Sequence, residues 1–151
     1  MYAVDIVLHF VKAINRADLR MLSTFMAKDH LFIDSDGTET RGRKAMRGAW
    51  GRYFAMMPDY HIDIDETYCS GGTVVLIGRA SGTYAVEGKL RARNRWSVPA
   101  TWRAVVIANQ VGVWQVFTNP EPIFAIMRGQ KSGAAKSIST KKSRARISSS
   151  G

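Results

Sequence analysis

The sequence predicts an α+β fold in which three helices precede a strongly curved, mainly antiparallel sheet. Before Pro58, apolar residues recur at helical spacing in three segments; after Pro58 they alternate with polar residues or form β-branched runs. Helices followed by strands are the order of an α+β domain rather than of an alternating α/β domain. A chain of 151 residues is long enough to bury one core of its own.

Each predicted helix has an apolar face and a recognisable end. The first spans residues 3–16, the second begins after Asp18, a favourable N-cap, and the third spans residues 43–57 and ends at Pro58. The apolar positions are Val4, Val7, Leu8, Val11 and Ile14 in the first, Leu19, Leu22, Phe25 and Met26 in the second, and Met46, Trp50, Tyr53, Phe54 and Met57 in the third.

Strands are predicted between the second and third helices and after the third. Residues 31–34 form a short strand that turns at residues 35–37 and returns through residues 38–40. The basic stretch 89–99 is expected to be partly irregular, and the prolines at 120 and 122 are expected to end the ordered part. The remaining predicted strands cover residues 60–69, 73–84, 101–108 and 113–118.

The basic charge of the chain is concentrated at its C-terminus. Six of the 22 Lys and Arg residues, and none of the 12 acids, follow Gly129. Residues 129–151 are rich in Ser, Gly, Ala and Lys, so we expect a domain over 1–128 and a disordered tail over 129–151. The tail has no aromatic residue for stacking on bases, so nucleic-acid binding is not expected beyond weak, non-specific contact.

Three further features favour a cytoplasmic protein. The one cysteine, Cys69, cannot form an internal disulfide, which fits a reducing compartment. The first ten residues contain an acid and no basic leader, unlike a secretory signal. No apolar run reaches the roughly 18 residues of a membrane-spanning helix, so we expect no membrane association.

Five segments carry a family resemblance: FVKAINRADLRMLSTFMAKDHLFIDSDG, GRKAMRGAWGRYFAMMPDYHIDI, VLIGRASGTY, PATWRAVV and VWQVF. Together they resemble the SnoaL-like branch of the nuclear-transport-factor-two-like superfamily, which is related to polyketide cyclases and ketosteroid isomerase. The resemblance implies a sheet that wraps around helices as a cone, a ligand pocket inside it, and a homodimer packed through the outer face of the sheet. Relatives include cyclases, isomerases, dehydratases, epoxide hydrolases and binding proteins without catalysis, so the fold does not choose the activity.

Asp34 is the candidate general base. In the isomerase that the chain resembles, the base is an Asp that closes the first strand before a turn glycine, and Phe32-Ile33-Asp34-Ser35-Asp36-Gly37 matches that pattern. Removing a proton beside a carbonyl requires a carboxylate in a poorly solvated pocket, and period-two geometry places Phe32 on the same face as Asp34. The alternative is that Asp34 only caps the turn, as Asp often does.

The other catalytic positions of the isomerase are not matched. Phe10 stands where the resemblance implies an enolate-stabilising tyrosine, and residues 100–106 contain no carboxylic acid. Because one oxyanion donor is worth about 2.7–4 kcal/mol, the loss of both argues against steroid isomerisation by that mechanism. Trp102 is a candidate replacement donor through its indole N–H. Arg79 is a candidate partner of Asp34, as in some epoxide hydrolases of this fold.

The remaining candidates are pocket residues rather than catalytic ones. We expect ligand contacts from Phe10, Phe32, Trp50, Tyr53, Phe54, Gln115 and Asn119. His61, Asp63 and Asp65 share one face of a predicted strand, but the first and last lie about 13 Å apart, too far to bind one ion. We predict neither a metal nor a cofactor.

The sequence therefore predicts a protein that binds a small hydrophobic molecule in a cone-shaped pocket. Acid–base turnover of that molecule, of the cyclase, isomerase, dehydratase or hydrolase type with Asp34 as base, is one form of this hypothesis. A non-catalytic binding module of the same fold is the alternative.

Overall fold

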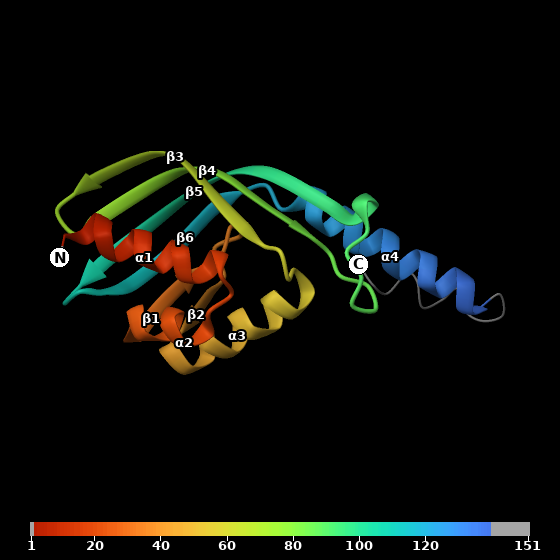
Figure 1. Cartoon of the computed structure of the whole chain (residues 1–151), viewed down its shortest axis with the longest axis horizontal. Coiled ribbons are helices and arrows are strands. Elements are labelled where there is room, and N and C mark those ends of the chain that lie inside the picture. Colours follow the sequence, from red (N-terminus) through yellow and green to blue (C-terminus); the bar gives the residue numbers. More distant parts are fainter. Residues whose placement is uncertain (1, 140–151) are drawn as a thin grey trace.

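The computed structural model describes residues 2–139 and confirms the α+β class. Three helices and a short strand pair come first, and four long strands and a fourth helix follow (Figure 1). The helices are α1 (Ala3–Asn15), α2 (Leu19–Phe25), α3 (Arg43–Met56) and α4 (Glu121–Ser139), with a short 3-10 helix at Ala92–Asn94. The strands are β1 (Met26–Ile33), β2 (Glu39–Arg41), β3 (His61–Ser70), β4 (Thr73–Thr83), β5 (Arg95–Ile107) and β6 (Gln110–Thr118).

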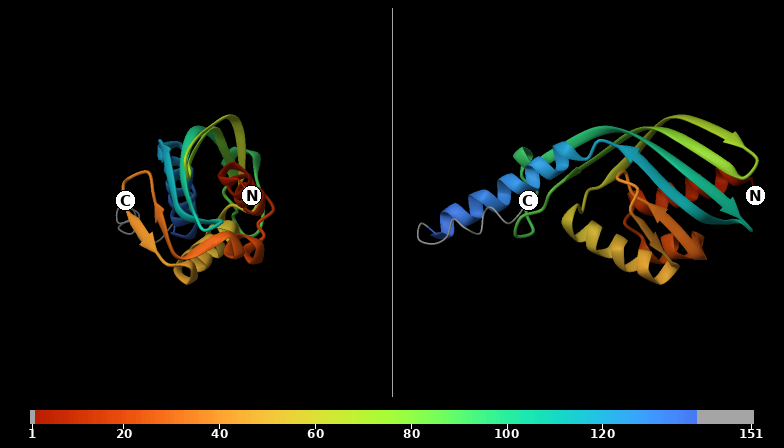
Figure 2. Two further views of the ribbon diagram at one scale, coloured as in Figure 1. Left: turned by 90° about the vertical axis from the view of Figure 1, so that its left-hand side faces the viewer. Right: turned by 180° about the vertical axis from the view of Figure 1, so that it is seen from behind.

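The six strands form one mixed sheet in the order β2-β1-β6-β5-β4-β3. All neighbours are antiparallel except β1 and β6, which run parallel. The sheet arches over α1, α2 and α3, and seen end-on it curls around the space that these helices partly fill (Figures 1 and 2). The predicted cone, with helices on the concave face of a mainly antiparallel sheet, is thus confirmed.

A bulge helps the edge of the sheet to bend. The pairing of β3 with β4 shifts between Ile64 and Glu66, opposite Gly78. A Cβ atom on Gly78 would lie 1.8 Å from the carbonyl oxygen of Asp63, so no other residue fits there without backbone movement. Bulges bend a strand and increase its twist, which agrees with the curvature seen at β3 and β4.

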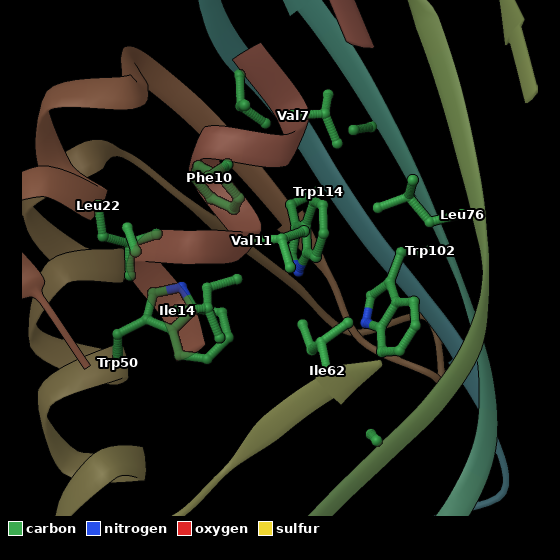
Figure 3. Packing of buried hydrophobic residues seen from close by; sticks show 14 of the residues in the cluster. Val7, Phe10, Val11, Ile14, Leu22, Trp50, Ile62, Leu76, Trp102 and Trp114 are labelled. Carbon is green, nitrogen blue, oxygen red and sulfur yellow. The ribbon is translucent and has the colours of Figure 1, made fainter. Parts of the chain in front are cut away.

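The core lies between α1 and the concave face of the sheet. Val7, Phe10 and Ile14 of α1 are completely buried, and the ring centroid of Phe10 lies 5.0 Å from that of Trp114. Trp114 stacks on Trp102 at 6.4 Å. Figure 3 shows these side chains converging from α1, β5 and β6, with Trp50 of α3 beside Ile14.

Two predicted strand boundaries are wrong. The strand expected at residues 31–34 begins at Met26, because Met26 and His30 both point into the core although Ala27-Lys28-Asp29 between them lacks strand-forming residues. The strand expected at residues 101–108 begins at Arg95. The expectation that the stretch 89–99 is partly irregular is confirmed, because its first six residues lie outside the strands and include the 3-10 helix. Pro99 is tolerated because the pairing of β5 with β6 ends at Ala100, so beside Pro99 one edge of β5 has no partner strand.

The end of the ordered part also differs from the expectation. Pro122 lies in the first turn of α4, where its missing N–H has no intrahelical partner to lose. The helix extends to Ser139, past the predicted start of the tail at residue 129, and the predicted domain boundary stays a prediction. Residues 140–151 lie outside the described residues, and the predicted disorder of that part stays a prediction. Within the described chain, no helix is long and apolar enough to cross a membrane.

Candidate functional site

A cavity of about 450 Å³ opens between the concave face of the sheet, α3 and the start of α4. Its wall is mostly aromatic and aliphatic. The lining residues are Phe32, Asp34, Ser35, Asp36 and Thr40 from β1, β2 and their turn; Met46, Ala49, Trp50, Tyr53, Met56, Met57 and Tyr60 from α3 and the following loop; Ala80, Trp96, Val98, Ala100, Trp102, Trp114, Val116 and Thr118 from the sheet; and Pro120, Ile123, Phe124 and Met127 at the start of α4.

Asp34 is both a turn residue and a cavity residue. Its backbone N–H donates to the carbonyl oxygen of Thr38, and its carbonyl oxygen accepts from Gly37. Its carboxylate accepts the N–H of Ser35 at 2.7 Å. The residue lines the cavity but is exposed, so the carboxylate lies at the mouth and not in a dry interior.

Aromatic residues on α3 and the loop after it form one wall. The ring centroid of Tyr60 lies 5.1 Å from that of Tyr53, 6.1 Å from that of Trp50 and 6.0 Å from that of Trp96. Burial, and to a smaller extent the charge of Asp34, raises the pKa of both tyrosines far above the ordinary value. Both phenols therefore stay protonated at neutral pH and are available as neutral hydrogen-bond donors.

The loop that carries Tyr60 is held by Asp59. Its carboxylate accepts from the backbone N–H and from the hydroxyl of Thr83, each at 2.7 Å, and lies 3.6 Å from Arg95. These contacts join the end of α3 to β4 and β5. Tyr60 is thereby directed toward the interior, on the same side of the chain as the buried Ile62 two residues later.

Trp50 carries a donor without a partner. Its side chain lines the cavity and is only 7% exposed, and its indole Nε1 is buried with no hydrogen-bond acceptor among the described residues. A buried N–H that makes no hydrogen bond costs about 1–3 kcal/mol. A ligand oxygen in the cavity is one way to recover that cost.

Five of the predicted site residues line the cavity, and five do not. Phe32, Asp34, Trp50, Tyr53 and Trp102 are in the lining, which does not by itself establish their roles. Phe10, Phe54, Arg79, Gln115 and Asn119 lie elsewhere, for reasons that differ from residue to residue.

The pairing of Arg79 with Asp34 is wrong. Along β4 the residues on either side of Arg79, Gly78 and Ala80, are buried, so Arg79 points to the outer face. There its Nε donates to the hydroxyl oxygen of Ser97 at 3.0 Å. The apolar neighbours that suggested a buried arginine belong to the opposite face of the strand.

The other four residues serve the fold. Phe10 is buried in the core, and Phe54 stacks on Trp50 at 5.3 Å without lining the cavity. Gln115 accepts from Arg103 at 3.3 Å and shares the register of that partly exposed, outward-facing residue. Asn119 accepts the N–H of Glu121 at 3.1 Å, at the start of α4.

Sequence reasoning missed residues on both sides of the cavity. Trp96, Val98 and Ala100 alternate inward along β5, and this period-two pattern is visible in the sequence although it overlaps the basic stretch 89–99. Ile123 and Phe124 come from α4, which was not predicted because the prolines at 120 and 122 were expected to end the ordered part. Nothing in the sequence showed that the start of this helix borders the cavity.

The triad His61, Asp63 and Asp65 gives no metal site. His61 and Asp63 lie 3.4 Å apart on the exposed face of β3. The bulge after Ile64 changes the register before Glu66. Over the part of the chain that the structure describes, no group of three His, Cys, Asp or Glu side chains is placed to hold an ion.

Comparisons with known proteins agree on the fold. A family model described as a SnoaL-like domain matches residues 7–118. A comparison with curated proteins finds no match. Among solved structures, a protein from Shewanella denitrificans OS-217, provisionally assigned as a SnoaL-like polyketide cyclase, is 18% identical, with a TM-score of 0.73 over 85% of this chain and 98% of that chain.

Two further structures are similar to the same extent. A provisionally assigned polyketide cyclase from Xanthomonas campestris pv. campestris is 21% identical, with a TM-score of 0.71 over 82% of this chain and 94% of that chain. IdmH from Streptomyces antibioticus, also provisionally assigned as a polyketide cyclase, is 17% identical, with a TM-score of 0.70 over 84% of this chain and 99% of that chain. At such identities, structural similarity establishes the fold and leaves the reaction open.

Proposed function

Because this chain belongs to the SnoaL-like domain family, we propose that it binds a small, largely apolar molecule in the cavity between the sheet, α3 and α4. The observation that carries the proposal is the cavity itself. Its volume of about 450 Å³ is in the range of small-molecule sites, and apolar side chains dominate its wall. Each square ångström of apolar ligand surface removed from water there contributes roughly 25 cal/mol.

The test is a ligand screen by thermal shift, combined with a variant that fills the cavity. Ligand binding to the native state raises the melting temperature. Ala49→Phe adds a ring to the α3 wall of the cavity, whereas Ala55→Phe adds the same ring to an exposed position of the same helix and is the matched control. A compound that stabilises the wild type and the control but not Ala49→Phe binds in the cavity. Equal stabilisation of all three proteins would place the binding elsewhere.

Acid–base turnover of the bound molecule is the second candidate function. It is favoured by the lining of one cavity by a carboxylate, Asp34, and two protonated phenols, Tyr53 and Tyr60. The carboxylate would take a proton from a carbon beside a ligand carbonyl, and the electron pair would move to the carbonyl oxygen. A phenol O–H would donate a hydrogen bond to that oxygen, replacing the donors absent at Phe10 and on β5.

Replacement of Asp34 separates turnover from binding. Asp34→Asn removes the base while keeping the size of the side chain, so turnover of a substrate is expected to vanish while binding stays within a few-fold. Asp63→Asn, at an exposed position of β3 outside the cavity, is the control. If Asp34→Asn binds and converts the substrate as the wild type does, Asp34 is not the base. If the wild type binds its ligand and does not convert it, the non-catalytic binding module becomes the better description.

We also propose that the protein is a homodimer that packs through the outer face of its sheet. Phe117 is 49% and Tyr68 is 55% exposed, and their strand partners Thr101 and Val75 face outward with them. Phe117→Asp is expected to yield a monomer in analytical ultracentrifugation, whereas Leu90→Asp, on an exposed loop, leaves the mass unchanged. A wild-type protein that is monomeric at high concentration would contradict this. The expected cytoplasmic location also remains a proposal.

A further inference from the structure

The cavity has the opposite charge to the chain. The protein carries a formal net charge of +10, with 22 Lys and Arg residues against 12 acids. Nevertheless, within residues 2–130, whose side chains the structure describes, the charged residues that line the cavity are Asp34 and Asp36 alone. A ligand that enters the cavity therefore meets carboxylates and no cationic side chain.

The turn between β1 and β2 holds both carboxylates at the mouth. Asp34 accepts the N–H of Ser35 at 2.7 Å, and Asp36 accepts the N–H of Thr38 at 2.8 Å. The hydrogen bonds from Thr38 lower the pKa of Asp36, which is therefore ionised at neutral pH. Among the described residues, neither carboxylate takes part in a salt bridge. The positive partner that would balance them is missing from the wall.

The inner wall of the cavity is suited to the uncharged part of a ligand whose positive group lies beside the two carboxylates. This wall is aromatic, with neighbouring ring centroids 5.1–6.1 Å apart among Trp50, Tyr53, Tyr60 and Trp96. Aromatic faces attract cations as well as apolar groups. The phenols remain neutral and so do not offset the carboxylates. The unpartnered N–H of Trp50 adds a demand for an acceptor, which a carbonyl, ether or hydroxyl oxygen of the ligand would meet.

We propose that the cavity binds small amines, with an aromatic or aliphatic body among the rings and a protonated nitrogen beside Asp34 and Asp36. The inference rests on the proposed binding of a small molecule in this cavity and specifies the chemical class of that molecule. Anionic ligands, such as free carboxylic acids, are disfavoured by the same two charges, which repel them at the mouth.

The expected selectivity is modest because both carboxylates are exposed. Because exposed ion pairs are weak, an amine is expected to bind about three-fold more tightly than the matching alcohol and about ten-fold more tightly than the matching acid. The Debye length falls from about 10 Å at 0.1 M salt to about 3 Å at 1 M, so the preference should shrink as salt is added.

A matched set of probes tests the proposal. 2-(2-Naphthyl)ethylamine, 2-(2-naphthyl)ethanol and 2-naphthylacetic acid share one ring system and differ mainly in the charge of the end group. Isothermal titration calorimetry at pH 7 and 50 mM salt measures the three dissociation constants. The order expected is amine, then alcohol, then acid. The double variant Asp34→Asn/Asp36→Asn should remove the difference between amine and alcohol while alcohol binding, which reports that the variant is folded, persists.

Glu39→Gln is the matched control, since Glu39 is an exposed acid on β2 outside the cavity lining. It is expected to keep the wild-type order of affinities. Binding of the alcohol with no preference for the amine, or a preference that Glu39→Gln also removes, would overturn the amine proposal and leave the proposed function standing. Failure of all three compounds to bind at millimolar concentration would overturn both.

Discussion

The two ends of the cone use aromatic and aliphatic residues in different ways. At the closed end, Phe10 and Ile14 of α1 are completely buried against the concave face of the sheet, and the ring of Phe10 contacts that of Trp114. At the open end, Trp50, Tyr60 and Trp96 surround a cavity of about 450 Å³. None of the residues of α1, all of which the structure describes, lines this cavity.

This comparison shows that the cavity results from the length and position of α1 rather than from unusual residues. Trp102 and Trp114 form the partition, because they contact the core on one side and line the cavity on the other. Beyond them the sheet continues and α1 does not follow it. There the side chains of the sheet face the cavity, which α3 and the start of α4 border on its other sides.

The largest expected effect breaks the closed end. Phe10→Ala removes a completely buried ring that contacts Trp114 and His30, so the free energy of unfolding is expected to fall by about 3–5 kcal/mol. Urea unfolding measures it. Phe10→Leu, which keeps most of the volume, should lose less than about 1.5 kcal/mol. A loss in Phe10→Ala as small as the loss in Phe10→Leu would contradict the prediction, because it would show that this end of the cone tolerates a void.

A smaller effect concerns pH, and it comes from His30 at the closed end. Its Nδ1–H donates to the carbonyl oxygen of Val111 at 2.7 Å, which leaves Nε2 as a buried acceptor with no partner among the described residues. Burial lowers the pKa of His30, although the hydrogen bond and the charge of Asp29 oppose the shift.

Because the folded state holds this proton less tightly than the unfolded state, stability is full above pH 6.5 and falls as the pH drops below it. The expected contribution is up to about 1 kcal/mol over the first pH unit. Chemical unfolding of the wild type and of His30→Gln between pH 5 and pH 7.5 measures it. The variant should lack this part of the slope, and an identical slope in both proteins would assign it to other groups.

At the open end, Phe124→Ala should affect binding more than stability. Phe124 lines the mouth and is 49% exposed, so its removal is expected to change the free energy of unfolding by no more than about 0.5 kcal/mol. The same change should weaken the binding of a ligand in the cavity a few-fold, because apolar contact is lost at the mouth. Calorimetric titration of a ligand found by the thermal-shift screen measures this, and a stability loss as large as that of Phe10→Ala would contradict the contrast between the two ends.

The smallest expected effect is that of removing residues 129–151. Within residues 2–130, whose side chains the structure describes, Met127 is the last residue of α4 that lines the cavity, so ligand affinity should be unchanged in the truncated protein. The same variant tests the basic segment, since any salt-sensitive binding of RNA or DNA should be lost with it. A large loss of ligand affinity would mean that the C-terminal segment contributes to the site.

Much of the architecture was predictable because local rules act within each element. The spacing of Val7, Val11 and Ile14 predicts α1, and Pro58 predicts the end of α3. Asp18 predicts the start of α2 as its N-cap, and in the structure it accepts the N–H of Met21 at 3.0 Å. The hairpin between β5 and β6 was also predictable, and there Ala108 and Asn109 take the positive φ values that such a two-residue turn requires.

The site was less predictable because orientation across elements is not encoded in spacing. Asp34 was recognisable from a turn pattern, but only the folded turn shows that its carboxylate is exposed at the mouth. Arg79 had apolar neighbours in sequence, and only the register of β4 shows that it faces outward. Tyr60 and Phe124 gave no signal, since each reaches the cavity through a contact with a distant strand or helix.

The amino-acid sequence alone determined the α+β class and the three N-terminal helices, because periodicity and capping act over a few neighbouring residues. The candidacy of Asp34 came from the family resemblance of the segment that contains it. The tertiary structure alone decided that the sheet extends past α1 and that the start of α4 borders the opening. It also decided that, within residues 2–130, the cavity wall carries carboxylates and no cation. Those properties depend on how far separate elements extend past one another, and no short stretch of chain contains that information.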